Sequence, residues 1–68
     1  MSVTCTGIVM AVNAAERALE AGKLYDAQLY ADNAFRMARA AAGRPWVSDL
    51  LVDIATVRDG IRKAQSWF

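Results

Sequence analysis

The chain has 68 residues, 56% of them hydrophobic, and a formal net charge of +1. We expect one domain, residues 1–68, with a small core, because a chain this short buries only about 60% of its unfolded surface. The near-zero charge, with acids and bases interspersed along the sequence, argues against strong attraction to nucleic acid or to an anionic membrane. The only cysteine is Cys5, which excludes a disulfide framework within these residues.

The segment from Val3 to Val12 is uncharged and mostly apolar, but its ten residues are too few to cross a bilayer, which takes about 20. No lysine or arginine precedes it, so the basic region of a secretory signal is missing. We therefore expect the start of a buried helix, no membrane contact and a cytoplasmic location. Abundant alanine, with arginine in excess over lysine, is typical of GC-rich genomes and favours a bacterial or bacteriophage source.

The first helix is predicted over 7–21. Thr6, or alternatively Thr4, is placed to cap it, and Gly22 ends it because glycine readily adopts the left-handed conformation that follows a helix. Polar residues occupy the opposite side of this helix. The predicted core positions are Ile8, Ala11, Val12, Ala15, Ala18 and Leu19.

The second helix is predicted over 24–42, with Gly43 and Pro45 preventing its continuation. Its apolar arc covers nearly half of the circumference, which is typical of a helix packed between two neighbours. The arc consists of Ala27, Tyr30, Ala31, Ala34, Phe35, Met37, Ala38 and Ala41.

The third helix is predicted over 45–66, starting at about Pro45 or Trp46. Gly60 costs about 1 kcal/mol in a helix interior, so we expect close packing or a slight bend there. The apolar seam of this helix consists of Val47, Leu50, Ile54, Val57, Ile61, Ala64 and Phe68. The three helices together predict an all-α fold, a small antiparallel three-helix bundle.

The stretch 18–34, ALEAGKLYDAQLYADNA, resembles the turn and second helix of a tetratricopeptide unit. Gly22 matches the glycine before the turn, Ala27 and Ala34 match small residues seven apart, and Tyr30 fits an aromatic position. The family's first-helix Trp, Leu and Gly positions fall on alanines here. One hairpin implies no solenoid. A hairpin followed by a third helix is instead similar to the microtubule-interacting and trafficking domain, and this resemblance implies peptide binding.

Residues suited to catalysis or metal binding are sparse. The chain has no histidine, and Cys5 has no basic neighbour in sequence, so we interpret it as a small hydrophobic residue. Asp49 and Asp53 share one side of the third helix, where a solvated acidic surface is the favoured interpretation and a cation site the alternative. We therefore expect neither an enzyme nor a cofactor.

Several large apolar residues fall outside the core stripes and indicate contact with a partner. Tyr25 and Leu29 lie one turn apart on the second helix, on the side that also carries Arg36. Aromatic residues together with arginine are typical of interface centres. Trp67 is a further candidate anchor near the chain end. These residues favour a non-catalytic protein-interaction module that binds another protein or itself.

An alternative is a small nucleic-acid-associated regulator that uses arginines of the second and third helices. This function requires Arg36, Arg39, Arg58 and Arg62 to converge on one basic surface. We expect acidic residues to interrupt that surface, with Asp32 paired to Arg36 and Asp59 to Lys63. The alternative is therefore the less favoured.

Overall fold

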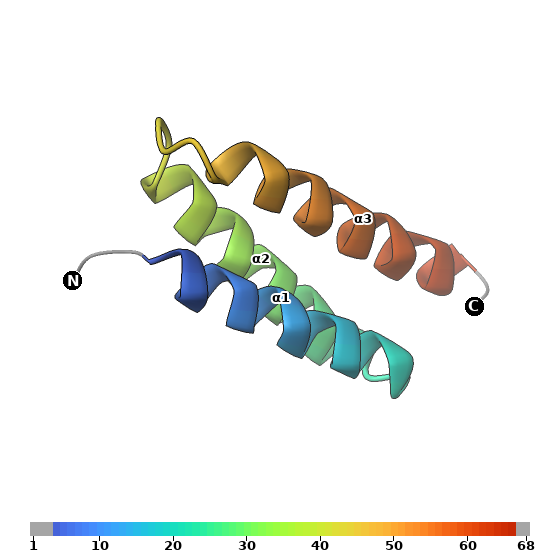
Figure 1. Ribbon diagram of the computed structural model, residues 1–68. Helices are drawn as coiled ribbons and strands as arrows, with labels where there is room; N and C mark the ends of the chain where they lie inside the picture. The colour runs from blue at the N-terminus through green and yellow to red at the C-terminus, as the bar shows by residue number, and fades with distance from the viewer. Residues whose placement is uncertain (1–3, 67–68) are drawn as a thin grey trace.

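The computed structural model describes residues 4–66, which form three helices and no strand. Helix α1 spans Cys5–Glu20, α2 spans Leu24–Ala40 and α3 spans Val47–Ser66. Each helix runs opposite to the one before it, and all three pairs of helices are in contact (Figure 1). The prediction of an antiparallel three-helix bundle is confirmed. Of the residues expected in the core or at an interface, Trp67 and Phe68 lie outside the described range.

Helix α1 begins two residues earlier than predicted, because Thr4 and not Thr6 provides the cap. The Gly7 backbone N–H donates to Thr4 Oγ1 over 3.0 Å. At the other end Gly22 has φ +76°. The Lys23 N–H donates to the Ala18 carbonyl over 2.8 Å and the Gly22 N–H to the Leu19 carbonyl over 3.0 Å, the paired bonds of a Schellman cap.

Helix α2 ends at Ala40, before the predicted position 42, and α3 begins at Val47, after Pro45 and Trp46. Between them the chain forms tight turns. The Ala42 N–H donates to the Arg39 carbonyl and the Val47 N–H to the Arg44 carbonyl, both over 3.2 Å. These bonds reach back three residues rather than four, which tightens the backbone and places both segments outside the regular helices.

The core is built from alanines of α2, a mixture of alanine and branched side chains of α1, and larger branched side chains of α3. Helix α2 contributes only alanine, which allows α1 and α3 to approach its backbone closely. The buried residues are Ile8, Ala11, Val12, Ala15 and Ala18 of α1, Ala27, Ala31, Ala34 and Ala38 of α2, Ala41 of the following turn, and Val47, Leu50, Ile54, Val57 and Ile61 of α3. Apart from Ala64 and Phe68, the predicted α3 seam is therefore confirmed as buried, and Ala64 is half-buried.

The large residues of the predicted α2 arc are not in the core. Tyr30 is 45% exposed, while Phe35 and Met37 are half-buried at its margin. Because alanine lets the neighbouring helices pack close to the α2 backbone, little space remains beside α2 for large side chains. These side chains therefore lie at the edges of the helix contacts. On α1, Leu19 is likewise half-buried rather than buried.

Gly60 marks a close contact between α3 and a side chain of α1. A Cβ atom at this position would be 2.9 Å from Leu19 Cδ2. Close packing is therefore what compensates for a glycine inside α3.

Replacement of the capping threonine tests the start of α1. Thr4→Ala is expected to lower the free energy of unfolding by about 1 kcal/mol, because the first turn loses its side-chain acceptor. Thr6→Ala is the matched control, and it should leave stability equal or slightly higher, since alanine is the better helix former. Urea unfolding followed by circular dichroism measures both values. Equal losses for the two variants would contradict the assignment.

A double-mutant cycle tests the contact at Gly60. Gly60→Ala should stabilise a Leu19→Ala background by about 1 kcal/mol through helix propensity. In the wild-type background the gain should be smaller by at least about 0.5 kcal/mol, because Leu19 must move. Gly22→Ala is the control for glycine chemistry alone, and it should destabilise by about 1 kcal/mol, since φ is positive at that position. Strict additivity at Gly60 and Leu19 would rule out the contact.

Candidate functional site

Three adjoining surface hollows lie on α2 and α3, two of them lined by both helices and the third by α3 alone, and Arg58 lines all of them. Asp32 is shared by the first two and Arg62 by the first and third. We call this continuous surface the α2–α3 groove. The residues that line it are Gln28, Leu29, Ala31, Asp32, Phe35, Arg36 and Arg39 of α2 and Ala55, Arg58, Asp59, Ile61, Arg62 and Gln65 of α3.

Helical spacing explains why these side chains meet. Gln28, Asp32, Phe35 and Arg39 recur at steps of four, three and four, so they follow one side of α2 next to its alanine stripe. The antiparallel arrangement places the end of α3 beside the start of α2. There the Gln65 side-chain amide donates to Gln28 Oε1 over 3.4 Å.

Phe35 lies at the centre of the groove's positive charge. The guanidinium carbon of Arg58 is 5.0 Å from the centroid of the Phe35 ring, and that of Arg39 is 5.9 Å from it. Both distances fall within the range of cation–π attraction, about 6 Å. Arg39 comes from the same helix as Phe35, whereas Arg58 comes from α3. The aromatic ring therefore lies within cation–π range of positive groups from two different helices.

The groove arginines have no ion-pair partner among residues 4–66. The single ion pair in that range joins Lys63 Nζ to Asp59 Oδ2 over 3.1 Å. Of the two pairs predicted from the sequence, Asp59–Lys63 is thus confirmed and Asp32–Arg36 is wrong. An exposed pair at this spacing is worth only about 0.5 kcal/mol, too little to fix two mobile side chains reliably.

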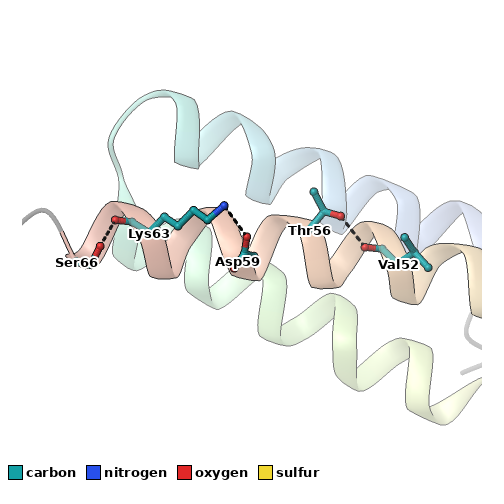
Figure 2. A network of polar contacts seen from close by, with 5 residues as sticks. All are labelled: Val52, Thr56, Asp59, Lys63 and Ser66. Carbon is teal, nitrogen blue, oxygen red and sulfur yellow. Dashed lines mark hydrogen bonds and ion pairs between the residues drawn. The ribbon is translucent and has the colours of Figure 1, made fainter.

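Figure 2 shows the outward row of α3 on which this ion pair lies, with α1 on one side of the helix and α2 on the other. Thr56 Oγ1 donates to the Val52 carbonyl over 2.9 Å, and Ser66 Oγ donates to the Lys63 carbonyl over 2.7 Å. All these side chains are exposed. This row, whose Asp59 also borders the groove, lies between the α2–α3 groove and the surface where α3 meets α1.

The structure brings together part of each residue set predicted from the sequence. Leu29 and Arg36 line the groove, and Leu29 is 51% exposed. Tyr25 is 74% exposed one turn earlier on α2 and lines none of the three hollows, while Trp67 lies outside the described residues.

The four arginines of the alternative set, Arg36, Arg39, Arg58 and Arg62, all line the groove. Arg58 shares a hollow with each of the other three, whereas Arg62 shares none with Arg36 or Arg39, so the single basic surface that the nucleic-acid hypothesis requires stays a prediction. Acidic side chains also interrupt the surface, with Asp32 in two of the hollows and Asp59 in the third.

Phe35 is the central groove residue that sequence reasoning did not select, because its position in the apolar arc predicted burial. Arg39, four residues later, was the available signal, since residues at this spacing are neighbours on a helix. No local signal placed Arg58 over the same ring, because that contact depends on the docking of α3 against α2.

Within residues 4–66 no cluster of three or more histidine, cysteine or acidic residues is arranged to hold a metal ion. In the same range no helix is both long and apolar enough to cross a membrane. Comparison of the chain with protein-family models, with curated proteins and with solved structures finds no match. The similarity to tetratricopeptide and microtubule-interacting domains therefore stays a prediction.

A double-mutant cycle measures the contact between Phe35 and Arg58. Phe35→Leu keeps most of the apolar area but removes the ring, and Arg58→Gln removes the charge. We expect a coupling of about 0.5 kcal/mol in urea unfolding, the size typical of an exposed cation–π pair. Arg62→Gln is the matched control on α3, and it should be additive with Phe35→Leu. Equal coupling for both arginines would show that the effect is general charge and not this contact.

Proposed function

We propose that the chain is a non-catalytic protein-interaction module that binds a protein surface through the α2–α3 groove. The observation that supports this proposal most is that Leu29, Phe35 and four arginines line adjoining hollows of the same groove. Interface centres are enriched in aromatic residues and arginine, because both offer large contact areas and arginine also makes directed hydrogen bonds.

The lack of ion pairs supports this proposal. Four guanidinium groups that have no carboxylate partner within residues 4–66 can bind carboxylates of another surface without first breaking an internal salt bridge. Guanidinium–carboxylate pairs are often bidentate, which adds orientation as well as attraction. We further propose a cytoplasmic location, based on the short apolar segment 3–12 and the single cysteine.

Nucleic-acid binding is the second candidate, favoured by the four arginines that line the groove. Two features weigh against it. A nucleic-acid backbone carries a charge at every nucleotide and would pass Asp32, whereas a protein can space its carboxylates to avoid that residue. A base stacked on Phe35 would also compete with the guanidinium groups of Arg39 and Arg58.

Capture from an extract of the source organism tests the leading proposal. Wild-type protein, Arg58→Glu and Arg44→Glu are immobilised in parallel, and the retained proteins are identified by mass spectrometry. Arg44 is an exposed arginine outside the groove, so it provides the matched charge control. We expect Arg58→Glu to lose partners that wild type and Arg44→Glu retain, and the purified partner to bind Arg58→Glu at least about tenfold more weakly.

The same proteins retained by all three baits would contradict binding through the groove. Fluorescence anisotropy with labelled single- and double-stranded DNA and RNA, at low and at moderate salt, addresses the second candidate. Groove-dependent binding that survives moderate salt would favour nucleic acid instead, and absence of binding even at low salt would remove that candidate.

A further inference from the structure

The charges of this nearly neutral chain are segregated in space, although they are interspersed along the sequence. The α2–α3 groove carries four arginines and few acids. On the other side of the outward row of α3, the surface formed by α1 and α3 carries acids. We call this surface the acidic face, and it consists of two pairs of acids, each with its members four residues apart on one side of a helix: Glu16 and Glu20 of α1, and Asp49 and Asp53 of α3.

The contact between Leu19 and Gly60 shows which sides of α1 and α3 meet and so form the acidic face. Asp53 lies seven residues before Gly60 and therefore on the same side of α3, the side that meets α1. Glu16 lies three residues before Leu19, on the side of α1 that meets α3. All four acids are exposed, and none has an ion-pair partner within residues 4–66. Two faces that flank α3 thus carry mainly unpaired charge of opposite sign.

Each of these faces also exposes apolar surface. On the outward row of α3, at the edge of the acidic face, Val52 is 65% exposed and adjoins Asp53, with Asp49 one turn before it. In the groove Leu29 is 51% exposed beside Phe35 and Arg36. Leu51, seven residues before Arg58 on the groove side of α3, is 39% exposed. Apolar contact together with complementary charge is what a specific interface requires.

From this complementarity we infer that the groove binds a second copy of the chain, with the acidic face of one molecule docked in the α2–α3 groove of the next. This inference rests on the proposed function, and it names the partner. The two surfaces are different, so the contact is head-to-tail and produces rings or open chains instead of a two-fold dimer. A standard interface takes about 800 Å² from each partner. That is a minor part of the 4910 Å² accessible surface, so one face of the bundle can supply it.

The small alanine core gives a physical reason for such assembly. Ile8 is the largest side chain that is fully buried within the described residues. A domain of this size is stabilised when apolar surface at its edges is covered by another molecule, because binding to the folded state alone shifts the folding equilibrium.

Two complementary charge reversals test the inference. Arg58→Asp blocks the groove and leaves the acidic face intact, whereas Asp53→Arg blocks the acidic face and leaves the groove intact. In sedimentation equilibrium, wild type should associate with rising concentration and return to the monomer mass of 7.4 kDa at high salt. Each variant alone should be at least about tenfold weaker in self-association, and an equimolar mixture should form a one-to-one dimer that cannot grow.

Matched controls keep the outcome interpretable. Arg44→Asp and Asp26→Arg reverse exposed charges outside both surfaces and should associate like wild type. Circular dichroism checks that every variant keeps its helicity, and Arg62→Asp with Glu16→Arg forms a second complementary pair if either primary variant fails to fold.

A wild type that stays monomeric at every concentration, or a mixture of complementary variants that does not pair, would overturn the inference. Loss of groove-dependent capture would instead overturn the proposed function. A monomeric wild type that still captures a partner through Arg58 would thus leave the proposed function standing and refute only the choice of a second copy.

Discussion

Close packing of the helices through alanine is the constraint on which the rest of this structure depends. Ala27, Ala31, Ala34 and Ala38 form an unbroken small stripe along α2, so α1 and α3 can both lie close to its backbone. On α2, alanine takes the place of the large interlocking side chains of a typical core. These contacts bury little apolar surface, however, because each alanine side chain removes only a small apolar area from water. Stability therefore depends on short turns, good caps and close approach at positions such as Gly60.

The same constraint creates the candidate binding surface. Large side chains that do not fit between closely packed helices are displaced to the margins, and Phe35 is the clearest example. At the margin its ring is half-buried and lies near the guanidinium groups of Arg39 and Arg58. The ring therefore serves two purposes, since it links α3 to α2 and concentrates positive charge in the groove. The interaction surface follows from the small core and needs no added element.

Charged side chains are distributed unequally on the two sides of the outward row of α3. Lys63 and Asp59 neutralise each other on this row, while Arg58 and Arg62 of α3 lie on the side toward α2 and Asp53 lies on the side toward α1. The formal net charge of +1 gives no indication that the charges are separated in this way. Composition alone therefore gave a poor guide to the surface, because steering and recognition depend on local charge and not on the total.

The sequence by itself determined the three helices, their antiparallel order and most of the core. Gly22 and Pro45 interrupt the chain locally, and the 3.6-residue period of alanine and branched residues fixes which side of each helix is buried. Thr4 and Thr6 were both left as possible caps, because local sequence satisfies either. Only the tertiary structure decided that Tyr30 is exposed, that Phe35 meets Arg58 and that Asp32 leaves Arg36 unpaired. The contact between Phe35 and Arg58 depends on how α3 docks against α2, and the exposure of Tyr30 depends on how closely the neighbouring helices pack on α2. The exposed Asp32–Arg36 pair is too weak for helical spacing alone to fix it. The 3.6-residue repeat within one helix does not predict such contacts between helices.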